Sequence, residues 1–226
     1  FEDKDFDIKY TSLNVTKNHI LPLDLTLSQN VESIFDNYKP DFIINTAGYT
    51  NVDLSENNRN IASKVNVNIV KNLLKYMPKT TKIIHISSDY IFDGLNAPYS
   101  EHDLPNPINY YGQSKLEAEN LIRSSRKKYI IIRTGNLYSQ FINLNSNRLS
   151  WIINSLSNNK KIFAADDMIS KPTNTCTIPN IILSLLPLND NLIINYTGQN
   201  TLSIFDFAML VAKTFNFDSS LINKCK

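Results

Sequence analysis

Three short runs of apolar, mostly β-branched residues alternate along the chain with segments of helical periodicity. The runs are DFIIN at 41–45, KIIHIS at 82–87 and YIIIR at 129–133. Each is hydrophobic almost without interruption, as expected for strands that are buried on both faces of a sheet. Helical spacing of apolar residues marks the segments at 27–38, 55–76 and 110–125. The alternation predicts an α/β fold, a Rossmann-like parallel sheet flanked by helices.

The last third of the chain has a different pattern. It begins with an Asn/Ser-rich stretch at 139–147 and continues with shorter predicted elements, in which Ser203 is a candidate N-cap. These elements are a helix at 149–156, a strand within KIFAADD at 161–167, a helix at 177–186, a strand within NLIINYTG at 191–198 and a helix at 203–215. We expect a Rossmann-like domain at 1–138 and a small α+β lobe at 139–226, with some segments of the lobe returning to the sheet.

Composition narrows the class of protein. A hydrophobic fraction of 42% argues against disorder, and a net charge of +2, scattered along the chain, argues against a nucleic-acid partner. No apolar run approaches the ~20 residues that a membrane span needs, so we expect no membrane association. Cys176 and Cys225 lie in no CxxC or Cys/His cluster, so we expect no bound metal and no disulfide framework. A cytoplasmic location is the simplest expectation.

The sharpest local signal is the pair Tyr111 and Lys115 in the segment YYGQSK. Residues four apart on a helix project from one face, so the phenol and the ammonium can approach each other. A neighbouring ammonium favours the phenolate and is expected to lower the pKa of Tyr111 from its usual value near ~10. The tyrosine could then act as a general acid or base. Taken alone, the pattern is also common on ordinary surface helices.

Two serines follow the central run KIIHIS. Ser87 and Ser88 stand at the carboxyl end of a predicted parallel strand, where ligands of open α/β sheets bind. Ser88 could donate a hydrogen bond to a carbonyl oxygen, although a turn or a helix cap would also explain a serine here. His85, inside the strand, is interpreted as a core histidine.

Six motifs occur in an order and spacing that resemble the extended short-chain dehydrogenase/reductases. They are NTAGYTNVD at 45–53, VNV at 65–67, SSDYIFDG at 87–94, YSE at 99–101, YYGQSK at 110–115 and RTGNLY at 133–138. Within that superfamily the chain is most similar to the dTDP-4-dehydrorhamnose reductases and to their relative, the regulatory β subunit of methionine adenosyltransferase. The resemblance extends over most of the chain, from about residue 22 to about residue 221.

The resemblance implies a catalytic set. Tyr111 corresponds to the tyrosine that gives a proton to the substrate oxygen while hydride leaves a nicotinamide. Lys115 corresponds to the lysine that lowers the tyrosine pKa and binds the nicotinamide ribose. Ser88 corresponds to the residue that polarises the substrate carbonyl, and Asn66 to a helix asparagine that supports the active site.

The resemblance also implies binding residues for NADP or NAD and for a nucleotide sugar. Those expected at the cofactor are Asp24, Leu25, Gly48, Tyr49, Thr50 and Ile86, together with Tyr111 and Lys115. Those expected at the sugar are Ser88, Asp89 and Asn136. The reductases carry a tryptophan where this chain has Asn136, and a Gly-x-Pro-Thr segment where it has Ser170 before Lys171-Pro172-Thr173.

The glycines of the chain do not form the Gly-rich turn that opens a dinucleotide-binding fold. The segment FEDKDFDIKYTSLN at 1–14 is interpreted as the end of a first helix followed by a second strand. We therefore expect the first βα unit of the fold, with its phosphate-binding turn, to be absent from this chain, and we expect the chain alone to bind the dinucleotide weakly.

The expected function is the NAD(P)H-dependent reduction of a 4-keto nucleotide sugar, in deoxysugar biosynthesis of the dTDP-rhamnose type. Two alternatives remain open. One is a non-catalytic regulatory subunit of methionine adenosyltransferase, and the other is a nucleotide-sugar epimerase or dehydratase. A homodimer is expected for the enzyme.

Overall fold

The structure is a computed structural model that describes residues 6–14, 17–139 and 147–226. Residues 1–5, where the end of a helix is predicted, and most of the Asn/Ser-rich stretch, at 140–146, lie outside the described residues. The chain divides into two compact units. Unit 1 contains Phe1–Arg133 and Pro187–Asn195, and unit 2 contains Thr134–Leu186 and Tyr196–Lys226.

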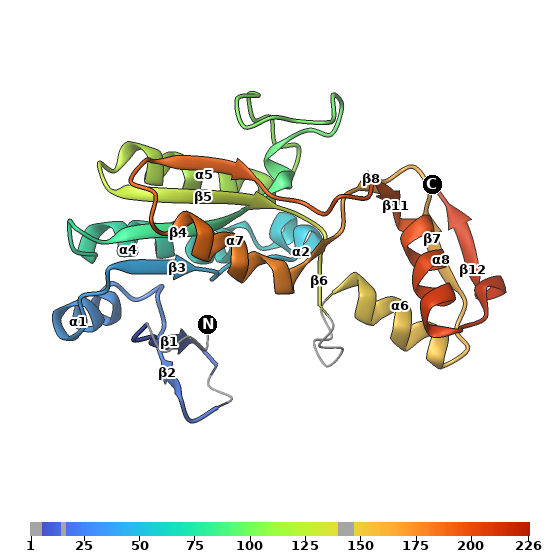
Figure 1. The fold of residues 1–226 in the computed structure, drawn as a ribbon, viewed down its shortest axis with the longest axis horizontal. Helices are drawn as coiled ribbons and strands as arrows, with labels where there is room; N and C mark the ends of the chain where they lie inside the picture. Colours follow the sequence, from blue (N-terminus) through green and yellow to red (C-terminus); the bar gives the residue numbers. More distant parts are fainter. Residues whose placement is uncertain (1–5, 15–16, 140–146) are drawn as a thin grey trace. The chain divides into compact units, whose positions relative to one another are not determined.

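A four-stranded sheet forms the centre of unit 1 (Figure 1). Its strands, in spatial order, are β10 (Leu192–Asn195), β5 (Lys128–Thr134), β4 (Lys82–Ser88) and β3 (Phe42–Asn45). β3 pairs in parallel with β4, and β5 pairs in parallel with β10. The three apolar runs predicted as strands are therefore neighbours in one sheet, and the predicted fold class is confirmed.

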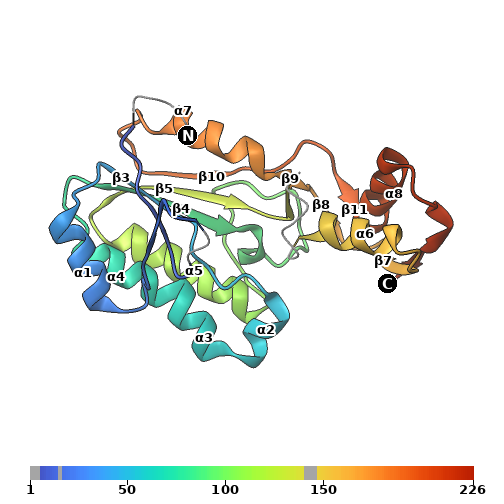
Figure 2. The same cartoon turned by 90° about the horizontal axis from the view of Figure 1, so that it is seen from below.

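Three helices of unit 1 cover one face of this sheet, as Figure 2 shows. They are α1 (Ser28–Asn37), α4 (Ile69–Tyr76) and α5 (Tyr110–Ser124). Their buried side chains pack against the strands in one hydrophobic cluster, whose members with no solvent exposure are Val31, Val70, Ile83, Ala118, Ile122 and Ile131. Full burial of one such aliphatic side chain contributes about 1.5–3 kcal/mol, so this cluster holds α5 firmly on the sheet.

The helix predicted at 55–76 is interrupted twice. α2 (Val52–Asn57) ends at Asn58, where the backbone leaves helical geometry, and α3 (Arg59–Ser63) follows. A π-helical turn at Lys64–Asn68 then separates α3 from α4. Such turns hold one extra residue and occur frequently at functional sites. Apolar periodicity correctly predicted helix here and the burial of Ile69 and Leu73, but Ile61, in the same pattern, is 49% exposed, and the breaks were not predicted.

Two short strands precede α1. β1 (Tyr10–Ser12) lies within the segment predicted to hold a strand, and it pairs in parallel with β2 (Ile20–Pro22) in a sheet of their own. The chain then passes Asp24 and Leu25 and enters α1.

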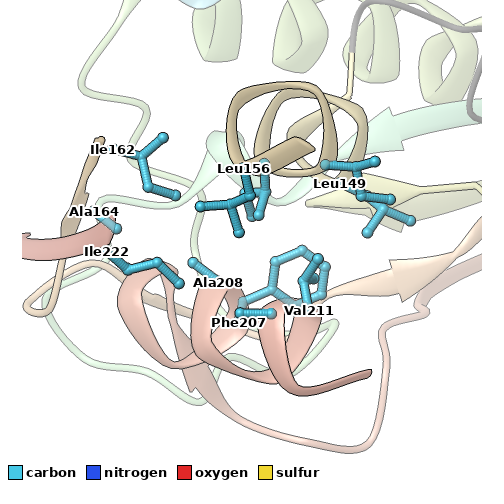
Figure 3. Packing of buried hydrophobic residues seen from close by; sticks show 11 residues of the cluster. Leu149, Leu156, Ile162, Ala164, Phe207, Ala208, Val211 and Ile222 are labelled. Atoms are coloured by element: carbon cyan, nitrogen blue, oxygen red, sulfur yellow. The ribbon is translucent and has the colours of Figure 1, made fainter. Parts of the chain in front are cut away.

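Unit 2 is an α+β unit with its own core (Figure 3). α6 (Arg148–Ser157) and α8 (Ile204–Phe215) pack with the parallel pair β7 (Ile162–Ala165) and β12 (Ile222–Cys225). Leu156, Phe207 and Ile222 are among the side chains that meet between them. Ser203 caps α8 in a capping box with Asp206, which confirms the predicted N-cap.

The other elements of unit 2 are short. β6 (Leu137–Tyr138) pairs in parallel with β9 (Thr173–Asn174), and β8 (Ile169–Ser170) pairs in antiparallel with β11 (Leu202–Ser203). α7 (Ile178–Leu185) follows β9 after one 3₁₀ turn. Across the described residues of both units, none of the helices has the length and apolar character needed to cross a membrane.

Candidate active site

Ser88 and Tyr111 meet where β4 ends and α5 begins. Ser88 is the last residue of β4, and Tyr111 is the second residue of α5. Asn109 caps the helix by accepting a hydrogen bond from the Gly112 amide at 2.8 Å. The side chain of Ser88 is near enough to that of Tyr111 to act on its pKa, and the two residues are only 4% and 8% exposed. The two residues expected at the substrate carbonyl oxygen are therefore brought together in a nearly dry site.

Gly112 allows this close approach. A Cβ atom at this position would lie 2.0 Å from the backbone oxygen of Tyr90, so only glycine fits between α5 and the turn that follows β4. The rings of Tyr90 and Tyr111 meet edge to face, with their centroids 5.7 Å apart. The glycine of the YYGQSK segment is thus a packing requirement of the site.

Lys115 lies one helical turn beyond Tyr111 and is 4% exposed. Its Nζ donates a hydrogen bond to the backbone oxygen of Ile86 at 2.7 Å, and it lies 3.5 Å from Nε2 of His85. Burial lowers the pKa of the Lys115 amine to about 8, and the nearby Glu119 carboxylate acts in the opposite direction. The amine therefore titrates close to neutral pH.

The pKa of Tyr111 departs from the sequence-based expectation. Burial raises it, a hydrogen bond with Ser88 lowers it by a smaller amount, and the negative charge of Asp89 raises it further. The net lowering of this pKa that was expected beside Lys115 is therefore wrong for this structure, because removal of the phenol from water outweighs the effects that favour the phenolate. Tyr111 is held as the protonated phenol, which is the form that can donate a proton.

Asn66 links the predicted cofactor loop to α5. Its Oδ1 accepts from the Tyr49 amide at 2.7 Å, and its Nδ2 donates to the Tyr49 oxygen at 3.2 Å and to the Ser114 hydroxyl at 2.8 Å. Asn66 sits in the π-helical turn, whose extra residue places the amide between these partners. The predicted loop residues Gly48 and Thr50, on either side of Tyr49, are exposed.

A buried cluster beneath the site was not predicted. Glu119 accepts from Arg133 through both carboxylate oxygens, with the shortest contact at 2.8 Å, and from the Ser87 hydroxyl at 2.5 Å. The cluster ties α5 to β4 and β5. The sequence held one indication of this cluster: Glu119 stands four residues after Lys115, so the two side chains share a face of the same helix.

Asp24 and Leu25, predicted near the cofactor, precede α1 and are half-buried. The Asp24 carboxylate accepts from the Thr26 amide at 2.9 Å and from the Thr26 hydroxyl at 2.7 Å, and these hydrogen bonds hold its pKa below the usual range. The Leu25 oxygen accepts from Asn72. Ile86 is also half-buried and offers its backbone oxygen to Lys115. Asp89, predicted at the sugar, accepts from the Ser88 hydroxyl at 3.3 Å.

Asn136 belongs to unit 2. Its backbone has a φ of 48°, in the left-handed region that Asn tolerates better than most residues. Its Oδ1 accepts from Arg148 at 2.7 Å, and its backbone oxygen accepts from the Thr173 amide. The side chain predicted to meet the sugar is thus held by a neighbouring arginine.

A cavity of about 410 Å³ lies within unit 2. Pro172 and Thr173, from the segment that resembles the family's Gly-x-Pro-Thr, line it together with Tyr138, Tyr196 and Gly198. Gly198 is required there, because a Cβ atom would lie 2.0 Å from the Pro172 oxygen.

A parallel sheet with a serine at the end of β4, next to the tyrosine of a YxxxK helix, defines an extended short-chain dehydrogenase/reductase. The family model described as the RmlD substrate binding domain matches residues 4–226, and the chain belongs to this family.

Individual relatives agree with this assignment. The dTDP-4-dehydrorhamnose reductase of Aggregatibacter actinomycetemcomitans is 31% identical over 210 residues, which are 89% of this chain and 69% of that protein. The methionine adenosyltransferase 2 subunit beta of Bos taurus is 28% identical over 205 residues, 88% of this chain but only 61% of that protein. A crystal structure of the Bacillus anthracis dTDP-4-dehydrorhamnose reductase in complex with NADP superposes with a TM-score of 0.85 at 27% identity, covering 92% of this chain and 75% of that one.

Proposed function

We propose that this protein reduces the 4-keto group of a nucleotide sugar, as a dTDP-4-dehydrorhamnose reductase does, with NADPH or NADH as the reductant. The observation that carries the proposal is the convergence of Ser88, Tyr111 and Lys115 in one buried site. The reductases among its relatives support the choice of substrate.

The donors at this site fit the nicotinamide end of a dinucleotide. An ammonium has three N–H groups, and the hydrogen bonds described for Lys115 supply one oxygen acceptor, Ile86 O. The remaining N–H groups suit ribose hydroxyls. The loop of Gly48, Tyr49 and Thr50, anchored by Asn66, is the proposed support for the rest of the cofactor. When bound, the reduced dinucleotide supplies the hydride.

The residues of the chain then handle the oxygen and the proton. Ser88 and Tyr111 hydrogen-bond the substrate carbonyl oxygen and polarise it. Tyr111 gives its proton to that oxygen as negative charge develops, and the Lys115 ammonium stabilises the phenolate that remains. Burial of all three residues excludes water and strengthens each of these interactions.

The cellular setting is part of the proposal. We place the protein in the cytoplasm, supported by Cys176 and Cys225, which are both free thiols. We also propose a homodimer, supported by Leu54 and Ile61, whose apolar side chains are 46% and 49% exposed on α2 and α3. Analytical ultracentrifugation of the purified chain tests the homodimer.

The activity is tested by mixing the purified protein with a dTDP-4-keto-6-deoxy sugar and with NADPH at a concentration high enough to saturate a weak site. The absorbance of the cofactor is followed, and the sugar product is followed by chromatography. Reduction consumes one cofactor per sugar. A product formed without net cofactor consumption would instead indicate an epimerase or a dehydratase. Tyr111→Phe serves as the inactive control.

The similarity to methionine adenosyltransferase β subunits favours one other candidate, a regulatory subunit. No turnover of any keto sugar, together with stable co-purification of a methionine adenosyltransferase, would replace the reductase proposal by this one. The YxxxK pair does not distinguish the two functions, because such a subunit can retain it.

A further inference from the structure

His85 is a buried titratable group that the proposed mechanism does not use. It lies in β4 with 1% of its surface exposed, and both ring nitrogens face side chains of other elements. Nδ1 lies 3.1 Å from Nδ2 of Asn45 on β3, and Nε2 lies 3.5 Å from Nζ of Lys115 on α5. The imidazole therefore connects a neutral amide to the lysine of the active site.

The orientation of the Asn45 amide decides where the imidazole proton lies. The Ala47 amide donates to Asn45 Oδ1 at 3.2 Å, so the oxygen must face Ala47. The Nδ2 group, which can only donate, then faces His85. Nδ1 of His85 must accept this hydrogen bond, which leaves the proton of the neutral ring on Nε2.

An Nε2–H group pointed at Lys115 favours one protonation state of the lysine. An ammonium has no lone pair, so it cannot accept from Nε2–H, whereas the neutral amine can. The long separation of 3.5 Å agrees with two groups that do not form a strong hydrogen bond, in contrast to the 2.7 Å from Nζ to Ile86 O.

We propose that Asn45 and His85 are positioning residues that hold the Nε2–H tautomer against Lys115 and thereby make its ammonium easier to deprotonate. For its consequence in catalysis this inference rests on the proposed function, since it sets the pH at which Lys115 stops stabilising the phenolate of Tyr111. The hydrogen-bond chain itself does not depend on the substrate.

Charged groups around Lys115 also shift the deprotonation equilibrium of its ammonium, and their influence must be distinguished from that of the His85 tautomer. Glu119 on α5 favours the ammonium and is itself paired with Arg133 of β5. Tyr111 lies one turn earlier on α5, and His85 approaches from β4. From β3 and the π-helical turn come the neutral residues Asn45 and Asn66. Burial and the nearby Lys115 charge both keep the pKa of His85 well below its usual value, so the ring stays neutral.

The tautomer can be read directly by ¹⁵N NMR of the wild-type chain, with no variant and no enzymatic activity. The protein has three histidines, and His19 and His102 are exposed, so they serve as internal comparisons. We expect His85 to show a protonated Nε2 and a bare Nδ1 from acidic to alkaline pH. A proton on Nδ1, or a doubly protonated ring at neutral pH, would overturn the proposal.

Two substitutions of Asn45 then distinguish the effect of hydrogen-bond direction on Lys115 from the effect of charge. Asn45→Leu removes the donor that fixes the His85 tautomer and adds no charge. Asn45→Asp offers an acceptor to a His85 Nδ1–H group and adds a negative charge. Both should move the Lys115 titration, followed by the ¹³Cε shift of the lysine, upward by about one pH unit, the size expected for one hydrogen bond.

A shift in Asn45→Asp alone would show that charge is responsible, and it would refute the proposal. If the wild-type tautomer and the Lys115 shift are as expected but no keto sugar is reduced, the proposed function fails and the positioning role stands. If the sugar is reduced and the alkaline limit of the rate does not follow the Lys115 titration in Asn45→Leu, the catalytic consequence is refuted.

Discussion

Glu119 and Arg133 form an ion pair that is almost completely excluded from solvent. Their side chains are 0% and 3% exposed, and the closest nitrogen and oxygen lie 2.8 Å apart. Arg133 also reaches the Glu101 backbone oxygen and stacks over the Phe92 ring. The pair therefore joins α5, which carries Tyr111 and Lys115, to the strand beside it.

Removal of one member of this pair should be costly. Glu119→Gln leaves the Arg133 charge buried without its partner, and we expect a loss of about 3–5 kcal/mol in the free energy of unfolding, measured by urea denaturation. Glu117→Gln is the matched control, because Glu117 lies on the same helix in an exposed contact with Lys71, and it should change stability by less than about 1 kcal/mol. Equal effects of the two substitutions would contradict a structural role for the buried pair.

Gly112→Ala should disturb the site through packing. The added Cβ would lie 2.0 Å from the Tyr90 oxygen, so α5 must shift, and we expect a destabilisation of about 1–3 kcal/mol together with a loss of turnover. Gly48→Ala provides the comparison for stability, since its Cβ would lie 3.5 Å from Asn66 Oδ1, an ordinary contact. Thermal unfolding of the two variants measures the difference. A Gly112→Ala protein as stable as wild type would show that the helix can move away without cost.

Tyr111→Phe should lower the rate of sugar reduction by about 10²-fold or more, because it removes the proposed proton donor. The far-UV spectrum and the melting temperature should stay close to wild type. Tyr110→Phe removes a hydroxyl from the preceding residue, whose ring stacks under Arg59, and it should retain activity. Wild-type turnover in Tyr111→Phe would exclude the assigned role.

The rate of reduction should depend on pH through Lys115. Burial lowers the pKa of this amine to about 8, so the ammonium is present below that pH and is lost above it. Because the ammonium stabilises the Tyr111 phenolate, initial rates at saturating substrate should fall as the pH rises through about 8. Glu119 raises the Lys115 pKa, so Glu119→Gln should move this fall to lower pH. A rate that stays level well above this pH would contradict the assignment.

The sequence predicted the parts of the fold that depend on local patterns. Unbroken apolar runs predicted β3, β4 and β5 as strands. The expected burial on both faces holds for most of β4 and β5, whereas β3 lies at the edge of the described sheet and its Ile44 is 38% exposed. A serine before an apolar helix predicted the cap of α8. Tyr111 and Lys115 were found because both lie on one helix, where spacing alone determines that they share a face.

Features that depend on contacts between distant segments were not predicted. Glu119 and Arg133 are separated by a loop, and nothing in their spacing indicates a buried pair. The direction of the Tyr111 pKa shift depends on how much water is excluded from the phenol, which residue spacing in the sequence does not show. His85 was correctly interpreted as a core histidine, but its link to Lys115 requires knowing which strand lies beside which helix.

The π-helical turn at Lys64–Asn68 makes the helix locally irregular, but it also places Asn66 where it organises the site. Deletion of one residue within it would restore an ordinary α-helical path from α3 into α4 and improve the backbone hydrogen bonds. The same deletion would rotate Asn66 by about 100° around the helix axis and separate it from Tyr49 and Ser114. A shortened chain of this kind should therefore have a more regular helix but leave the loop at Gly48–Thr50 without its anchor, so the irregular turn is what holds that loop against α5.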